Sequence, residues 1–312
     1  MKKILWMMIA IVAIATSCAR SDESFNSSIM YSEDFTGILG DDTRTMLDGT
    51  AVKWCSDDLL TIFTKTSHNR KYKIKSLNDN GCSATFEYES YTGVDNSAIS
   101  SNYALYPYDI SASLSGDVIT TTIAAEQAYN SERTDLSYAL MVAKSDNTTF
   151  TFSNAGALLR FNISKKVPDS FTLKSITLSS ATNKLSGEVI INTATDCKAI
   201  VSDSGSNEVA LTNINTAIPD AGLSFHIALP ATTFAEGDLS VTFNFTEGIK
   251  QFVLPAFDLT QGKIKTIKYT ISDAEDFTGN TPGNGDDTDD EIPIVGPKPM
   301  NNEIWYTATS KV

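Results

Sequence analysis

The side chains best suited to acid–base, nucleophilic or metal chemistry are few and poorly placed in this 312-residue chain. Its two histidines are His68, in a polar run that predicts a hairpin tip, and His226, which lies between Phe225 and Ile227. That alternation places His226 on the solvent side of a strand rather than in a general-base position. The chain has no HExxH, GxSxG or P-loop motif, and no Cys/His pair at metal-ligand spacing. We therefore expect no enzyme activity, no cofactor and no metal site.

The body of the chain has three cysteines, Cys55, Cys82 and Cys197. Because this number is small and odd, they cannot form a complete disulfide framework. Cys55 and Cys82 could pair in an oxidising compartment, but buried free thiols are the favoured interpretation. An acidic run over residues 286–291 could attract Ca²⁺ through its oxygen ligands. Its spacing does not match an EF-hand loop, so a solvated linker is favoured there.

The fourth cysteine, Cys18, ends a segment that is typical of a secretory signal. Two lysines are followed by an apolar run over residues 4–15, and two small residues precede the cysteine. The run is too short to span a bilayer comfortably. This ending resembles the lipobox of bacterial lipoproteins, in which the cysteine is acylated on its thiol and its new amino terminus. The resemblance implies lipid attachment at Cys18 and stable membrane anchoring. The alternative is an ordinary signal peptide with a chance cysteine.

The charge of the chain excludes some partners. The formal net charge is −14 at pH 7, and removal of residues 1–17 takes away two lysines and brings it to −16. Such a chain is a poor match for nucleic acid, and anionic membrane surfaces would repel it, so the lipid must hold it at the membrane. The Ser/Asp/Glu cluster at residues 21–24 resembles an export signal to the outer face of the outer membrane, with a solvated tether as the alternative.

Hydrophobic side chains alternate along most of the chain from Tyr31 to Ser272. The clearest case is Leu239, Val241, Phe243 and Phe245 with polar residues between them. The same period recurs over residues 159–163, 225–229 and 267–271, and turn signals separate these runs over residues 78–81, 114–117 and 260–263. No long amphipathic helix pattern occurs. We therefore predict an all-β fold built of sandwiches.

The β region is too long for one small sandwich and suits two of ordinary size. A polar interruption at residues 145–148 marks the boundary, and Gly-rich and acidic composition after Ser272 predicts a disordered linker. The predicted parts are a signal peptide (1–17), a tether (18–30), an N-terminal β-sandwich (31–148), a C-terminal β-sandwich (149–272), an acidic Gly/Pro-rich linker (273–300) and a tail (301–312).

Several motifs in this order resemble the fimbrillin family, the lipoprotein pilins and accessory adhesins of anaerobic Gram-negative bacteria. They are Thr43-Arg44-Thr45, Val52-x-Trp54, Asp57 to Phe63, Tyr103 to Tyr108, Phe150 to Phe161, Leu229-Pro230 and Gly262-Lys263. Each motif alone is weak, and together they span roughly residues 43–271. The resemblance implies two tandem transthyretin-like β-sandwiches and no enzymatic activity. At the carboxyl end, Asn302 to Thr307 resembles the entry to leucine-rich-repeat surface proteins.

The family resemblance also implies two events in assembly. In some relatives, cleavage after an arginine near Arg44 frees a groove for strand exchange, although Thr-Arg-Thr occurs in uncleaved relatives too, so that cleavage is the less favoured interpretation. The β-forming residues of 292–312 could then act as an exchangeable strand, joined to the body by a flexible linker. Pro293, Pro297 and Pro299 would confine its pairing to short stretches.

We therefore expect a lipid-anchored outer-membrane protein facing the cell exterior, which acts in fimbrial assembly, anchoring or adhesion. Its partners would be other fimbrial subunits or copies of itself, with a host protein or glycan as a further partner. One alternative is a glycan-binding lipoprotein that uses Tyr88, Tyr91, Tyr103 and Tyr106 as an aromatic platform, although core packing is the default for strand tyrosines. Another is a stalk that carries a leucine-rich-repeat domain.

Overall fold

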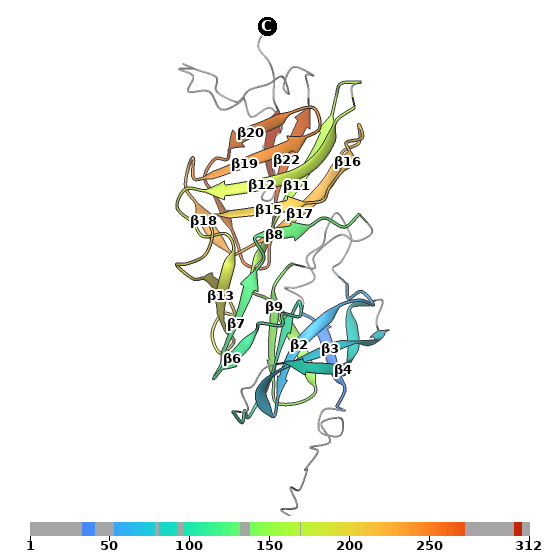
Figure 1. Cartoon of the computed structure of the whole chain (residues 1–312), viewed down its shortest axis with the longest axis vertical. Helices are drawn as coiled ribbons and strands as arrows, with labels where there is room; N and C mark the ends of the chain where they lie inside the picture. The colour runs from blue at the N-terminus through green and yellow to red at the C-terminus, as the bar shows by residue number, and fades with distance from the viewer. Residues whose placement is uncertain are drawn as a thin grey trace, which may run out of the picture. The chain divides into compact units, whose positions relative to one another are not determined.

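The computed structural model describes residues 33–40, 53–78, 81–92, 97–131, 138–168 and 170–271, together with the backbone of residues 303–307. These residues form strands joined by turns and loops, and no α-helix occurs among them (Figure 1). The all-β prediction is therefore confirmed for the described part of the chain. Its alternating runs are strands with one buried face, as in residues 239–245, where Leu239, Val241, Phe243 and Phe245 are all buried.

Seven strands close into a barrel. In pairing order they are β1 (Phe35–Leu39), β10 (Thr149–Asn154), β9 (Met141–Ser145), β5 (Asn102–Tyr106), β2 (Leu59–Thr64), β3 (Thr66–Asn78) and β4 (Ser83–Thr92). The strand β1 closes the ring because it pairs antiparallel with β4 and parallel with β10. Gly37 in β1 makes room for the filled interior, since a Cβ there would lie 2.8 Å from Cε2 of Phe86. Closure removes the exposed sheet edges that a sandwich would leave.

Two further sheets face each other across a second core. One contains β17 (Leu223–Leu229), β11 (Ala157–Lys165), β22 (Ile264–Ile271) and β23 (Glu303–Thr307). The other contains β20 (Ile249–Val253), β19 (Leu239–Phe245), β12 (Thr172–Ser180), β15 (Glu208–Thr212) and β8 (Glu126–Ala128), with β16 (Thr216–Ala217) also paired to β12. The ring of Phe243 on β19 lies 5.6 Å from Phe161 on β11 and 5.1 Å from Tyr269 on β22. These aromatic contacts join the two layers.

Two small sheets complete the described structure. The first has the order β14 (Ala199–Val201), β13 (Gly187–Asn192), β7 (Val118–Ile123) and β6 (Ser113–Ser115), and the second pairs β18 (Thr232–Phe234) with β21 (Phe257–Leu259). A third hydrophobic cluster lies under the first of these sheets and includes Ile119 of β7, Val189 of β13 and Leu105 of β5. This cluster joins residues from both halves of the chain.

The N-terminal half differs from the predicted sandwich because it is a closed barrel. Period-2 alternation shows only that each strand buries one face, and both a sandwich and a barrel satisfy that condition. Strands on the two sides of the predicted boundary at 148/149 also share sheets. The strand β10 completes the barrel, β13 pairs with β7, and β8 pairs parallel with β15. The boundary itself stays a prediction.

Candidate assembly site

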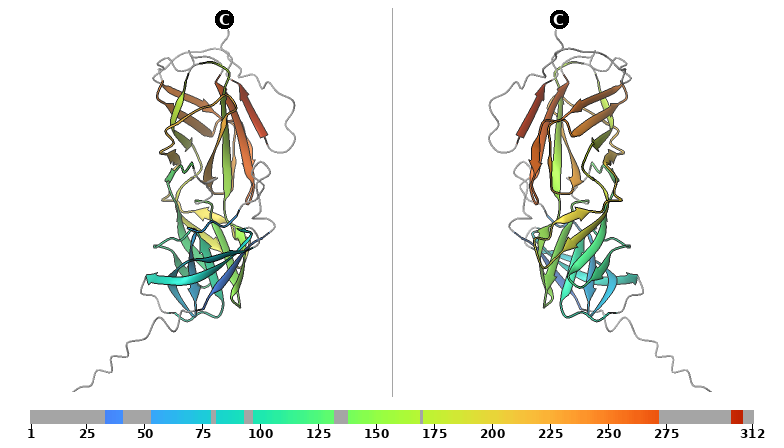
Figure 2. Two further views of the ribbon diagram at one scale, coloured as in Figure 1. Left: turned by 90° about the vertical axis from the view of Figure 1, so that its right-hand side faces the viewer. Right: turned by 90° about the vertical axis from the view of Figure 1, so that its left-hand side faces the viewer.

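The C-terminal strand β23 lies along the edge of β22, parallel to it. Their Cα partners run from Thr266 opposite Glu303 to Thr270 opposite Thr307. In both views of Figure 2 the red arrow of β23 lies beside the orange arrow of β22. Without β23, β22 would be the edge strand of its sheet and would present unpaired backbone N–H and C=O groups. This edge is therefore a site to which a strand can be added.

The edge is rigid because β22 is held along its whole length by β11. The two strands pair in parallel from Leu158 opposite Ile264 to Lys165 opposite Ile271. On one face of β22, Ile267, Tyr269 and Ile271 are buried in the core between the layers. An incoming strand therefore meets a surface whose backbone is already in place.

The opposite face of β22 is fixed by polar contacts with β11. Arg160 is buried and its Nε donates a hydrogen bond of 2.9 Å to Oγ1 of Thr266. Four residues further along both strands, the hydroxyls of Ser164 and Thr270 lie 3.0 Å apart and share a hydrogen bond. One face of β22 is thus packed in the core between the layers and the other is bonded to β11, and its outer edge is the part that pairs with β23.

The connection between the two strands is long. Residues 272–302, 31 in number, separate the end of β22 from the start of β23. A parallel pair needs a crossover of about a dozen residues or more, and 31 residues could reach about 100 Å when extended. The strand also begins after Pro299, the last of the three prolines that would interrupt a ladder. The length therefore permits β23 to pair with its own chain or with a neighbour.

Comparison with protein families matches the model described as Fimbrillin-like over residues 43–285. The chain belongs to the Fimbrillin-like family. The match covers the strands of the barrel and of the two facing sheets apart from β1 and β23, so the resemblance drawn from the motifs is confirmed. No curated protein matches the chain.

Solved structures similar to this Fimbrillin-like chain come from Bacteroides and Porphyromonas species. A Bacteroides ovatus protein provisionally assigned to cell adhesion has 17% identity and a TM-score of 0.48, with 76% of this chain and 91% of that chain covered. One from Bacteroides uniformis with the same assignment has 19% identity and a TM-score of 0.45, with coverage of 77% and 93%. The tip fimbrial protein Mfa3 of Porphyromonas gingivalis has 9% identity and a TM-score of 0.29, with coverage of 71% and 82%. The family assignment rests on the sequence match, because these TM-scores are below 0.5.

The two residues predicted to be modified, Cys18 and Arg44, lie outside the described residues. Lipid attachment at Cys18 and cleavage after Arg44 therefore stay predictions. Of the predicted exchangeable segment 292–312, the structure describes the backbone of residues 303–307, and that stretch is a strand. The described part of the chain contains no helix that is both long and apolar enough to cross a membrane.

The four tyrosines considered as a glycan platform do not share one surface in this Fimbrillin-like structure. Tyr103 and Tyr106 are buried, Tyr88 is half-buried, and Tyr91 is exposed. The hydroxyl of Tyr106 donates a hydrogen bond of 2.9 Å to Oδ1 of Asp58 inside the molecule. Burial of Tyr106 confirms the default prediction of core packing for this residue.

The histidines lie in strands. The hairpin turn expected at His68 is instead at Lys65, whose φ of 62° reverses the chain between β2 and β3, so His68 is two residues into β3. His226 lies opposite Arg160 in the pairing of β17 with β11 and is half-buried rather than fully exposed, because the polar face of that sheet is itself covered. Within the described ranges, no three His, Cys, Asp or Glu side chains gather as a metal site would require.

The three cysteines of the body, Cys55, Cys82 and Cys197, are free thiols and half-buried. Burial raises the pKa of the Cys197 thiol, and the nearby carboxylate of Asp196 raises it further. The neutral thiol is therefore favoured at this position. This arrangement agrees with the interpretation of these residues as free thiols, although they are less deeply buried than expected.

One group of polar residues was not recognised in the sequence. Tyr103, Asp117 and Lys144 come from β5, the turn between β6 and β7, and β9, and they meet at one carboxylate oxygen. Each residue type is common in strands and turns, and the three are up to 41 positions apart in the chain. The only sequence signal near them was the turn predicted over residues 114–117. Their meeting depends on how the barrel closes.

Proposed function

We propose that this Fimbrillin-like chain is a lipid-anchored protein of the outer cell surface that acts in fimbrial assembly or anchoring, or in cell adhesion, through β-strand interfaces. The observation that carries the proposal is the parallel addition of β23 to the edge of β22. The same backbone hydrogen bonds can form when the strand comes from a neighbouring copy, because only the connecting segment differs. Each copy would then receive one strand and donate one.

Further features support this proposal. A net charge of −14 does not suit binding to nucleic acid, and the family match is to fimbrillins. We propose that the protein works by binding rather than by catalysis and needs no cofactor. A lipid on Cys18 would attach it to the membrane. We also propose that residues 31–148 and 149–272 are two tandem transthyretin-like units, which interlock through the sheets that they share.

Removal of β23 should abolish assembly. We compare the chain from Ala19 to Val312 with a version that ends at Asn302, which lacks β23, by size-exclusion chromatography with light scattering. The complete chain should form oligomers, and the version ending at Asn302 should remain a monomer because it has no strand to donate. Trypsin treatment of both tests whether cleavage at Arg44 promotes the assembly.

The matched control ends at Thr307, so that it loses residues 308–312 and keeps β23. It should assemble like the complete chain. The proposal fails if the complete chain and the Asn302 version give identical monomer profiles, before and after trypsin. Circular dichroism of each version checks that the sheets remain folded.

A further inference from the structure

A polar pocket of about 390 Å³ opens beside the barrel, away from the strand-addition edge. Its walls come from the start of β3, the loop of residues 97–100, β5, the β6–β7 turn and β9. The loop is held in place by backbone hydrogen bonds: Ser67 N donates to Ser97 O at 2.8 Å, and Ile99 N donates to Lys65 O at 3.2 Å. The volume lies within the range of about 300–1,000 Å³ that is usual for small-molecule sites.

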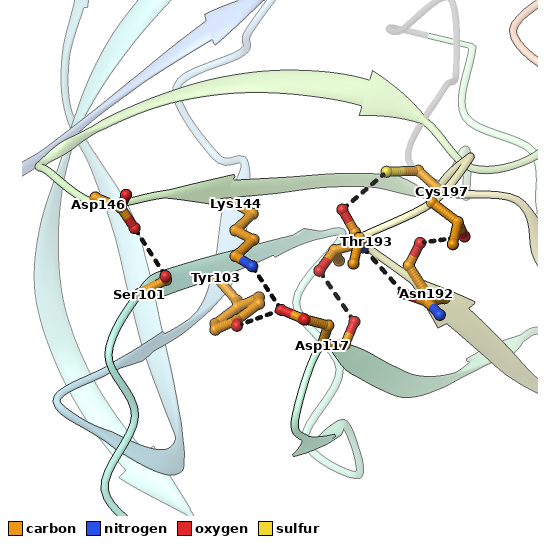
Figure 3. Close-up of polar contacts among 10 residues, drawn as sticks. Ser101, Tyr103, Asp117, Lys144, Asp146, Asn192, Thr193 and Cys197 are labelled. Carbon is orange, nitrogen blue, oxygen red and sulfur yellow. Dashed lines mark hydrogen bonds and ion pairs between the residues drawn. The ribbon is translucent and has the colours of Figure 1, made fainter.

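One of the residues that line the pocket is Asp117, whose carboxylate is the meeting point of two polar side chains (Figure 3). Its Oδ1 accepts hydrogen bonds of 2.6 Å from the hydroxyl of Tyr103 and from Nζ of Lys144. Nζ of Lys144 also lies 5.5 Å from the centroid of the Tyr103 ring. The other oxygen, Oδ2, accepts no hydrogen bond from the described residues, so it is free to accept one from a ligand.

The position of Asp117 is fixed from its backbone as well. Its carbonyl oxygen accepts hydrogen bonds from the N–H of Thr193 at 2.9 Å and from the hydroxyl of Thr193 at 3.0 Å. Thr193 follows β13, which pairs with β7, so the turn that carries Asp117 is tied to the neighbouring strand of its own sheet. A carboxylate held at both ends is already placed for binding, which lowers the entropic cost of ordering it.

Charges in the pocket cancel. The hydrogen bond from Lys144, followed by that from Tyr103, lowers the pKa of Asp117, and the bond to Asp117 raises the pKa of Lys144. Burial and the bond to Asp117 both raise the pKa of Tyr103, which keeps its hydroxyl protonated as a donor. At neutral pH the pocket therefore contains one cation and one anion in contact. This pair disfavours ligands that carry a net charge of either sign.

Ser67 supplies a second sign of a ligand. Ser67 lines the pocket and is only 6% exposed. Its hydroxyl oxygen is buried and has no hydrogen-bond partner. A buried hydroxyl without a partner costs about 1–3 kcal/mol. Rotation of the Ser67 side chain to another staggered rotamer would bring the hydroxyl to the pocket, where a ligand hydroxyl could satisfy it, since each hydroxyl both donates and accepts. Ile99 and Leu114 add an apolar surface to the same pocket, against which the C–H face of a sugar ring can pack.

We propose that this pocket binds one residue of a neutral saccharide through Asp117, Lys144 and Ser67. Oδ2 of Asp117 accepts from one sugar hydroxyl, Lys144 donates to a neighbouring oxygen, and the Ser67 hydroxyl bonds a third. The pocket contains no residue of β22 or β23, so the proposal stands independently of the strand addition. It would give a surface protein of this family a way to attach to glycans.

The test is saturation-transfer NMR on the chain from Ala19 to Val312 with a panel of matched probes. The neutral set is glucose, galactose, mannose, fucose and N-acetylglucosamine, and the charged set is glucuronic acid and glucosamine. We expect transfer to at least one neutral sugar and none to its charged counterpart. Binding of charged probes only, or of no probe, would overturn the proposal.

Variants then locate the binding by titration with the strongest neutral sugar. D117N should weaken binding about tenfold or more, because Asn presents an amide in place of a charged acceptor. S67A should weaken it by several-fold while leaving the fold intact, since it removes a hydroxyl that has no partner. The matched control is D146N: Asp146 accepts a 2.7 Å bond from Ser101 close to the pocket but does not line it. Unchanged affinity in both D117N and S67A would refute the assignment.

Discussion

Replacement of Trp54 by alanine should lower the free energy of unfolding by about 3–5 kcal/mol. Trp54 is 3% exposed, and its ring meets those of Phe86, Tyr106 and Phe152 edge-on at 5.2, 5.5 and 5.3 Å. Each such contact is worth about 0.5–1.5 kcal/mol beyond the burial of apolar area. Alanine would remove all three and leave a cavity in the barrel.

Two further variants sharpen this test by urea denaturation. Trp54→Phe should cost less than Trp54→Ala, because the indole N–H is buried without a hydrogen-bond partner and its loss breaks no bond. Ile110→Ala is the exposed control, since Ile110 is 68% exposed, and it should change stability by no more than about 0.5 kcal/mol. A Trp54→Ala protein as stable as the parent would contradict the barrel core described above.

Replacement of Asp238 by alanine should lower the free energy of unfolding by about 2–4 kcal/mol. Asp238 is buried and accepts hydrogen bonds from Ser180 Oγ at 3.0 Å, Thr182 N and Oγ1 at 2.9 Å each, and Asn183 Nδ2 at 2.6 Å. These bonds hold the loop after β12 against the start of β19. Without the carboxylate, several of the donors lose their partner.

The same residue should make stability depend on pH. Burial raises the pKa of Asp238, but the bonds from Thr182, Asn183 and Ser180 lower it more, so its pKa in the folded protein is below the ordinary value. A depressed carboxyl pKa gives stability that is present above the unfolded value of about 3.9 and lost as pH falls through the folded value. The stability gap between the parent and Asp238→Ala should therefore be constant near neutrality and shrink below about pH 4.

Asp258→Ala is the matched control for Asp238→Ala. Asp258 is exposed and accepts one hydrogen bond, of 2.7 Å, from the hydroxyl of Thr233. Loss of Asp258 should change the free energy of unfolding by no more than about 0.5 kcal/mol, and the difference from the parent should not shrink at acid pH. An equal cost for the two substitutions would show that the network around Asp238 does not stabilise the fold.

The strands of this chain could be predicted from local pattern because burial of one face leaves a period of two in the sequence. Leu239 to Phe245 and Ile267 to Ile271 follow that pattern, and their inward residues are buried. The barrel could not be predicted in the same way. Its closure depends on β1 pairing with β10, which lies more than 100 residues away, and no local pattern specifies such a partner.

The two candidate sites, the strand β23 and the pocket at Asp117, also differ in how far local sequence predicts them. The segment 292–312 is predicted as an exchangeable strand because β-forming residues stand on both sides of its prolines, and β23 lies in its second half. Its parallel register on β22 could not be predicted, because that depends on which sheet edge the fold leaves open. The pocket at Asp117 could not be predicted at all, since its residues come from separate turns and strands that the barrel brings together.

Disulfide cross-linking between two copies is the most direct test of strand addition between molecules. Lys268 and Trp305 are opposite each other in the β22–β23 pair. Neighbouring strands lie about 4.8 Å apart, within the Cα separation of about 4.4–6.8 Å that a disulfide accepts. One copy carries Lys268→Cys, the other carries Trp305→Cys and a mass tag, and the three native body cysteines are replaced by serine in both.

After the two copies are refolded together and oxidised, the account predicts a disulfide-linked heterodimer on a non-reducing gel. Pairing the Trp305→Cys copy with a Lys250→Cys copy, whose cysteine lies on β20 in the other sheet, should give none. The contradicting result is an absence of heterodimer from the Lys268 and Trp305 copies while a single chain carrying both substitutions forms the disulfide within itself.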